Sequence, residues 1–102
     1  MTAQQTGGTR TSYAVNRIVC FEGEGALKAY CDLAINDEVV IKGLRVVEGK
    51  HKLFVSFPRQ MGKDSKWYDN VVLLTKHAEQ AIGETVLAAY HAEQAAYARE
   101  TR

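Results

Sequence analysis

The spacing of the apolar residues changes once along this chain of 102 residues, at Thr75. Before Thr75, apolar and polar residues alternate, most clearly over residues 26–36, and this period of two predicts β-strands with one buried face. After it, residues 76–100 are rich in Ala, Glu and Gln, and their apolar positions recur at helical spacing. We therefore expect an α+β fold, in which a C-terminal α-helix packs on a small antiparallel β-sheet of four to five strands.

Turn-forming residues divide the part before Thr75 into five extended segments. These are residues 12–20, 26–36, 39–47, 53–57 and 67–75. Asn16-Arg17 interrupts the apolar pattern of the first segment, and Pro58, the only proline, ends the fourth because it lacks an amide proton. Residues 59–66 contain Gly and Ser among polar residues and are expected to form a flexible connection. Thr75 is expected to cap the helix.

Length and composition predict a single domain over residues 12–102, with the sheet in 12–75 and the helix in 76–100. Residues 1–11 are small, polar and without periodicity, so we expect a flexible N-terminal tail. A core this small leaves sheet faces and edges to cover, which favours a dimer. No apolar run approaches the roughly 20 residues of a membrane span, and no secretory signal is visible. The expected location is cytoplasmic.

Cys20 and Cys31 are the only cysteines. In a hairpin centred on residues 23–26 they would lie nearly opposite one another, so a cross-strand disulfide is conceivable. Free cysteines in strands are more often small core residues, and this interpretation is favoured. Two cysteines without a CxxC spacing do not predict a zinc site.

The net charge of +1 conceals an uneven distribution. Residues 42–66 hold seven basic and two acidic residues, whereas residues 21–41 carry a net charge of −4 and the chain from residue 78 onward carries −2. A positive segment of this kind favours a polyanionic partner such as DNA or RNA. A solvated hairpin with ordinary surface lysines is the alternative, and charge alone does not decide between them.

The stretch 44–58 predicts two strands joined by a basic turn, where Gly49 is free to adopt a positive φ. The candidate phosphate-binding residues lie in this stretch and just after it: Arg45, Lys50, Lys52, Arg59, Lys63 and Lys66. Gln60 is a candidate for hydrogen bonding to a base edge. Trp67 or Tyr68 could stack on an unpaired base, although packing in the protein is the favoured role for both. Arg45 could instead pair with Glu48 or with an acid on a neighbouring strand.

No catalytic motif occurs in the chain, so we expect no enzyme activity, no catalytic residue, no small-molecule substrate, no cofactor and no metal. The three histidines suggest no metal site, because His77 and His91 would lie about 21 Å apart along one helix. The repeat HAEQA that contains both is typical of helix-forming composition. Past Tyr90 the apolar stripe weakens, so the helix end either frays or packs on a partner subunit.

The sequence from Arg45 to Gly49, Arg-Val-Val-Glu-Gly, is followed by Leu53-Phe54-Val55 and then Phe57-Pro58. These residues resemble the most distinctive stretch of the SpoVG family (stage V sporulation protein G), septation regulators of bacteria. The similarity runs without gaps from about residue 12 to residue 90. It includes Arg17, Gly25, Ala29, Glu38, Val40, Trp67, Asp69, Ile82, Val86, Leu87 and Tyr90.

This resemblance implies an antiparallel sheet with a C-terminal helix, a dimer formed through the sheet, and a regulator that binds DNA and in some members RNA. The chain also departs from the family pattern. A Lys-Arg pair after the proline is reduced to Arg59, a His-Pro pair is replaced by Val72-Leu73, and the basic residues of the first helical turns are replaced by residues 78–81, Ala-Glu-Gln-Ala. We therefore expect the positive surface in residues 42–66 and not on the helix. A protein-interaction or scaffold module without nucleic-acid binding is the alternative function.

Overall fold

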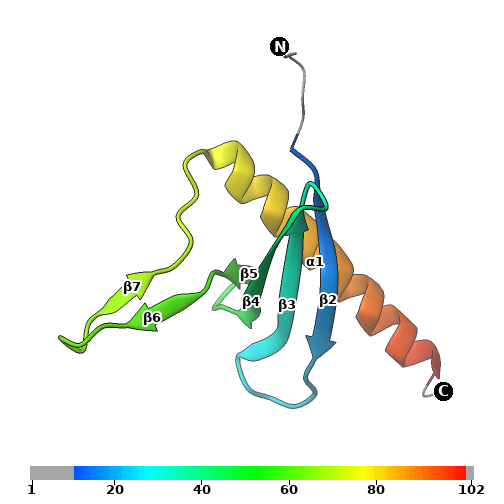
Figure 1. Ribbon diagram of the computed structural model, residues 1–102. Coiled ribbons are helices and arrows are strands. Elements are labelled where there is room, and N and C mark those ends of the chain that lie inside the picture. The colour runs from blue at the N-terminus through cyan, green and yellow to red at the C-terminus, as the bar shows by residue number, and fades with distance from the viewer. Residues whose placement is uncertain (1–10, 101–102) are drawn as a thin grey trace, which may run out of the picture.

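The computed structural model describes the backbone of residues 11–100 and the side chains of residues 11–97. Four strands, β2 (Tyr13–Cys20), β3 (Leu27–Ile35), β4 (Val39–Glu48) and β5 (Leu53–Ser56), form an antiparallel sheet in the order of the sequence. A smaller sheet consists of β6 (Arg59–Met61) and β7 (Trp67–Asp69), and the chain ends in α1 (Lys76–Glu100). In Figure 1 the helix crosses one face of the large sheet, and β6 and β7 project away from it as an arm.

The predicted α+β fold with a C-terminal helix on an antiparallel sheet is confirmed. The expected flexible tail, residues 1–11, lies outside the described residues except for Thr11. No helix within residues 11–100 has the length and apolar character needed to cross a lipid bilayer.

The core lies between α1 and the face of the sheet that the helix covers. Alternate residues of β3 and β4 and one stripe of α1 contribute its buried members: Ala29, Cys31, Leu33, Leu44, Val46, Ile82, Val86 and Tyr90. The predicted alternation in β3 and the predicted helical stripe are therefore confirmed. The open face of the sheet is left without a covering element in the described part of the chain.

The pairing of β2 with β3 corrects two expectations. The predicted interruption at Asn16-Arg17 is a β-bulge, because the register shifts between Val15 and Arg17 while the strand continues. Beyond the bulge, Cys20 pairs with Ala29 and Cys31 pairs with Ile18. The two cysteines are thus not opposite one another, and both are free thiols, Cys20 exposed and Cys31 buried.

Two turns shape the sheet by different means. Between β3 and β4, Asn36 and Asp37 have φ values of 55° and 56°, and the amide of Glu38 donates to the carbonyl of Ile35, as in a type I′ turn. Ile35 pairs with Val39, so the connection has three residues. Between β4 and β5, the positive φ expected at Gly49 is absent. Gly49 provides space instead, because a Cβ there would lie 3.1 Å from the Phe54 ring and 3.2 Å from the Lys52 carbonyl oxygen.

The prediction of a flexible connection over residues 59–66 is wrong, because β6 pairs with β7. The turn between them is closed by hydrogen bonds that hydrophobic periodicity does not reveal. The amide of Gly62 donates to the Lys66 carbonyl, and that of Lys66 donates to the carboxylate of Asp64. The predicted fifth segment, 67–75, is a strand only over β7.

Residues 70–75 run from the arm to the start of α1 without regular structure. The predicted cap at Thr75 is present, since its Oγ1 accepts a hydrogen bond from the amide of Ala78 at 3.0 Å. At the other end the helix continues to Glu100, and Tyr97 hydrogen-bonds to Glu22 in the connection between β2 and β3, which raises the pKa of Tyr97.

Candidate nucleic-acid interface

One row of side chains crosses all four strands on the open face of the large sheet. Val19 pairs with Tyr30, Tyr30 with Arg45, and Arg45 with Ser56. Paired residues of antiparallel strands share a face, and their neighbours along the strand point to the other one. Ala29, the neighbour of Tyr30, is buried beneath α1, so the row points away from the helix.

Arg45 occupies the middle of this row. Its guanidinium carbon lies 5.9 Å from the centroid of the Tyr30 ring, and Tyr30 makes an edge contact with Phe21 at 5.3 Å between centroids. The alternative that Arg45 pairs with Glu48 is wrong, because the Glu48 carboxylate lies 3.4 Å from the Lys28 ammonium. Among the described residues, no carboxylate forms an ion pair with Arg45.

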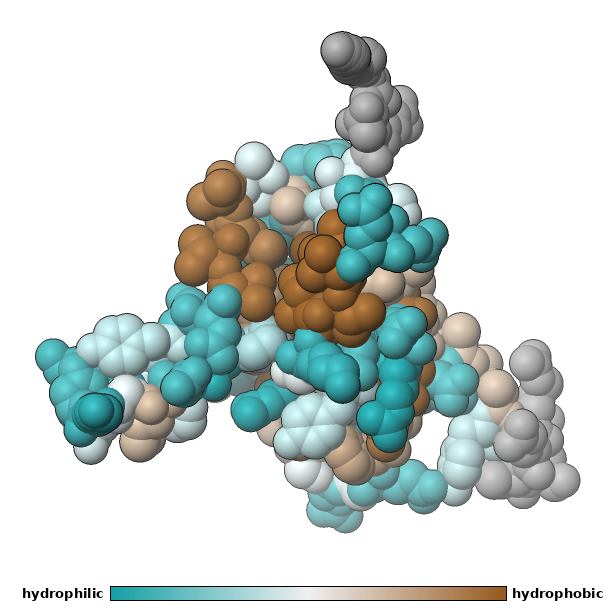
Figure 2. Space-filling view, viewed as in Figure 1, coloured by the Kyte–Doolittle hydropathy of each residue, from teal (hydrophilic) through white to brown (hydrophobic). Residues whose placement is uncertain are grey.

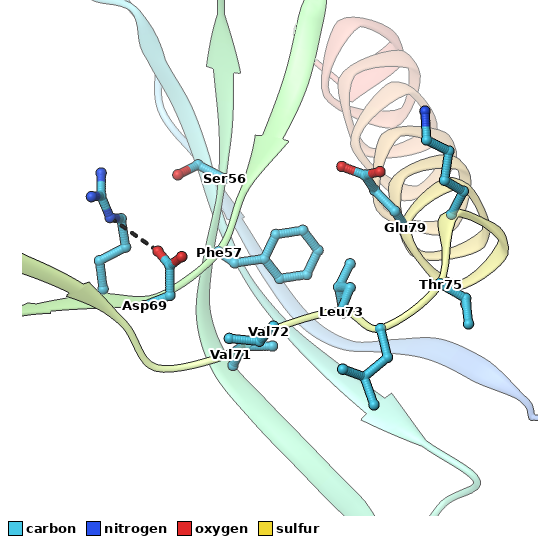
Figure 3. Close-up of a pocket in the computed structure, with 11 residues that line it drawn as sticks. Ser56, Phe57, Asp69, Val71, Val72, Leu73, Thr75 and Glu79 are labelled. Atoms are coloured by element: carbon cyan, nitrogen blue, oxygen red, sulfur yellow. Dashed lines mark ion pairs between the residues drawn. The ribbon is translucent and has the colours of Figure 1, made fainter.

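The first residue of the arm, Arg59, makes two contacts across β6 and β7. Its Nε lies 3.2 Å from the Asp69 carboxylate, and its guanidinium carbon lies 5.9 Å from the centroid of the Trp67 ring. The Arg59–Asp69 ion pair is drawn in Figure 3. Trp67 remains 55% exposed, so the guanidinium covers only part of the indole.

A small hollow of about 150 Å³ lies where the large sheet meets the arm. We call it the arginine notch; its lining residues are Arg45, Ser56, Phe57, Arg59 and Trp67. Two guanidinium groups, one hydroxyl and one indole therefore meet at one place, with the carboxylate of Asp69 engaged by Arg59. Such a set of donors is suited to binding an anionic oxygen group.

The four predicted lysines lie at two separate turns. Lys50 and Lys52 belong to the turn between β4 and β5, and Lys63 and Lys66 belong to the turn of the arm. All four are exposed, and within residues 11–97 none forms an ion pair with a carboxylate. The structure thus brings Arg45 and Arg59 together at the notch and places the lysines beyond it.

The two aromatic residues of β7 lie on opposite faces of the arm. Trp67 pairs with Met61, whereas Tyr68 pairs with Gln60, which is exposed. The Tyr68 hydroxyl donates to the Asp64 carboxylate at 2.5 Å, which lowers the pKa of Asp64 and raises that of Tyr68. The Tyr68 ring also lies where a side chain at Gly62 would have to go, 2.7 Å from a Cβ there. Tyr68 therefore holds the turn of the arm, although it is 50% exposed and lies outside the core.

Sequence reasoning missed two participants, Tyr30 and Ser56. The strand register places Tyr30 and Ser56 opposite Arg45 on the two neighbouring strands, and neither residue stands out by its type. Alternation within the strands could have placed each on the open face. The order and register of the strands were needed to place them beside Arg45.

A larger hollow, of about 640 Å³, lies between the base of the arm and the start of α1. Figure 3 shows Phe57 and Leu73 in it, with Glu79 on the helix side. In Figure 2 an apolar area covers the segment between the arm and α1, another lies on the open face of the sheet, and the arm is largely hydrophilic. Within the described residues, no group of three or more His, Cys, Asp or Glu side chains could hold a metal ion.

Comparison with known proteins agrees with the resemblance seen in the sequence. The family model for SpoVG matches residues 14–92. A protein of Archaeoglobus fulgidus named as a septation protein, SpoVG, is 37% identical over 78 residues, which are 76% of this chain and 92% of that protein. A protein of the same name from Symbiobacterium thermophilum is 39% identical over 82 residues, covering 80% of this chain and 56% of the relative.

Proposed function

This chain belongs to the SpoVG family, and on that premise we propose that it is a regulatory protein that binds DNA or RNA and acts as a dimer. The relatives are named for septation, so we propose effects on septation or gene expression in the cytoplasm. We propose neither an enzymatic role nor a cofactor. Nucleic acid and a second copy of the chain are the proposed partners.

The observation that carries this proposal is that most cations in residues 42–66 form no ion pair with a carboxylate of the described residues. Of the seven, only Arg59 forms an ion pair with a carboxylate among the described residues, and the remaining charges are uncompensated by direct contact. Cations that are exposed and unpaired can neutralise phosphates and release counterions, which supplies most of the affinity of non-specific nucleic-acid binding.

The experiment is a gel-shift titration with duplex DNA, single-stranded DNA and RNA of equal length at two salt concentrations. We expect binding that weakens as salt increases, with log K falling by about 0.9 per neutralised phosphate on duplex DNA and by about 0.7 on single strands, per unit of log salt. Absence of a shift up to about 10 µM protein at low salt would contradict the proposal, because non-specific binders reach about 10⁻⁴–10⁻⁶ M even at physiological salt.

A scaffold function without nucleic-acid binding is the second candidate. The observation that favours it is the acidic start of α1, where Glu79 and Glu84 are exposed. Both line a hollow together with Lys52 and Phe54, a mixed surface of a kind that a protein partner can contact. The same titration distinguishes the two functions, because a scaffold would give no salt-dependent shift.

A further inference from the structure

Aromatic and arginine side chains follow one another along a line on the open face of the sheet. Phe21 contacts Tyr30, Tyr30 lies beside Arg45, the arginine notch joins Arg45 to Arg59, and Arg59 lies beside Trp67. We call these five residues the aromatic–arginine line. Four separate strands, β3, β4, β6 and β7, contribute to it besides the connection that holds Phe21, so the line is a product of the fold and not of one sequence motif.

The aromatic residues of this line are partly exposed to solvent. Tyr30 is 41% exposed, Phe21 is 40% exposed and Trp67 is 55% exposed. An exposed aromatic ring can stack on an unpaired base whatever the sequence, because every base has a π-face. An arginine beside the ring can also contact the base, because a guanidinium plane stacks on aromatic faces.

The notch at the middle of the line has a net positive charge. Arg45 and Arg59 supply two guanidinium groups, and among the described residues Asp69 is the one carboxylate that forms an ion pair with either of them. Ser56 adds a hydroxyl donor between the two. Guanidinium groups bind phosphate oxygens through paired hydrogen bonds, so a phosphodiester group fits this donor set.

The spacing of the row fits one short stretch of nucleic acid, and the stacking of bases inside a duplex favours a single strand. Neighbouring strands lie about 4.8 Å apart, so Tyr30 and Ser56, on either side of β4, are separated by about 10 Å. A base on Tyr30 and a phosphate near Ser56 can then belong to one short stretch of nucleic acid. Bases inside a duplex are stacked on each other and cannot reach a flat protein face without unstacking.

We propose that this face binds single-stranded nucleic acid, with bases stacked on Tyr30 and Trp67 and a phosphate held in the arginine notch. The inference rests on the proposed function and names its substrate class. A second copy of the chain is the other conceivable occupant. Two-fold pairing of this face would bring the guanidinium groups of two copies into one interface, and like charges that face each other without a carboxylate repel.

Trp67 is the only tryptophan, so its fluorescence reports directly on one end of the line. The native protein is titrated with an oligothymidylate, with an abasic oligomer of the same length, and with a duplex. We expect the oligothymidylate to quench Trp67, while the abasic oligomer and the duplex bind through their phosphates without comparable quenching.

Affinity for a labelled oligothymidylate is then measured by anisotropy for Trp67→Leu, Tyr30→Leu and a matched control. Alanine-scanning values for base–aromatic stacking correspond to a loss of about 5- to 150-fold in affinity per base, and we expect each of the first two variants to fall in this range. The control is Tyr97→Leu, which removes an aromatic of similar exposure, 50%, from α1, outside the aromatic–arginine line and the arm. We expect its affinity to change less than twofold.

The outcomes separate this inference from the proposed function. Binding without Trp67 quenching, or an equal loss of affinity in Tyr97→Leu, would overturn the stacking line and leave the proposed function standing. Absence of binding to all three probes would overturn both. A lower molar mass of the free Trp67→Leu or Tyr30→Leu protein in light scattering would assign the face to a second copy of the chain and overturn the inference.

Discussion

At the scale of single residues, the role of a side chain is decided by what lies opposite it across the strands. Arg45 contacts the Tyr30 ring and lines the arginine notch, although Glu48, three residues further along the chain, carries the opposite charge. Trp67 and Tyr68 are adjacent in sequence, yet one lies beside Arg59 and the other holds the turn of the arm. Residue type alone does not distinguish such roles.

The two cysteines provide a test at this scale. Cys31 is 1% exposed, and burial, together with the nearby charge of Asp32, raises the pKa of its thiol to about 11. Cys20 is exposed, so we expect one fast and one slow phase when the native protein reacts with a thiol reagent at pH 8. The variant Cys20→Ser should lose the fast phase. Two fast phases would show that Cys31 is accessible.

The same pKa predicts a loss of stability at alkaline pH. In the unfolded chain the Cys31 thiol ionises near its ordinary value of 9.0, whereas in the fold it stays protonated up to about 11. The contribution of this thiol to the free energy of unfolding is therefore complete below pH 9. It is lost as the pH rises from 9 to 11, because the unfolded state releases its proton first. The free energy of unfolding should fall more steeply over this range in the native protein than in Cys31→Ala. Equal slopes would contradict the assignment.

At the scale of elements, long periodic segments were predictable and short polar ones were not. The alternation of β3 and the apolar stripe of α1 extend over enough residues to identify both from the sequence. The arm escaped prediction because β6 and β7 each have three residues, and hydrogen bonds at Gly62 and Asp64 close the turn between them.

The candidate site was predictable to a similar extent. Charge type alone identified the segment that carries the cations, residues 42–66. It could not group them, because the meeting of Arg45 with Arg59 depends on β5 ending at Ser56 and on the arm starting directly after Pro58.

The start of α1 gives a prediction at this scale. The Thr75 hydroxyl accepts a hydrogen bond from the Ala78 amide, one of the amides that lack a partner within the helix. Replacing Thr75 with Ala should lower the free energy of unfolding by about 1 kcal/mol, measured by urea denaturation. Thr75→Ser keeps the acceptor and serves as the control. An equal loss in both variants would show that the methyl group, and not the cap, is responsible.

At the scale of the whole molecule, one edge of the large sheet is incomplete. Within residues 11–100, β5 pairs with β4 only over Arg45–Glu48, and no strand pairs with that edge over residues 39–44. Val39 and Val40 in this part are 57% and 42% exposed, and Leu74 is 91% exposed. An open strand edge with apolar side chains can take up a strand of another chain, and we propose that the dimer forms here.

This dimer prediction is tested by light scattering coupled to size exclusion. The native protein should have twice the mass of its 11.3 kDa chain, and Val40→Lys should lower that mass, because a lysine on an open edge opposes strand pairing. The control is Val19→Lys on β2, where the valine has a similar exposure of 38%. A native monomer, or a control variant that dissociates while Val40→Lys does not, would contradict the proposed interface.

The central claim is that the exposed, unpaired lysines of the two turns neutralise phosphates. The most direct measurement is the salt dependence of nucleic-acid affinity for the native protein and for a variant with Lys50, Lys52, Lys63 and Lys66 replaced by Ala. The control variant Lys76→Ala removes an exposed positive charge outside residues 42–66. We predict a log–log slope that flattens by about 0.9 per lost contact on duplex DNA, or about 0.7 on single strands, in the fourfold variant only. A slope that the fourfold variant leaves unchanged would contradict the account.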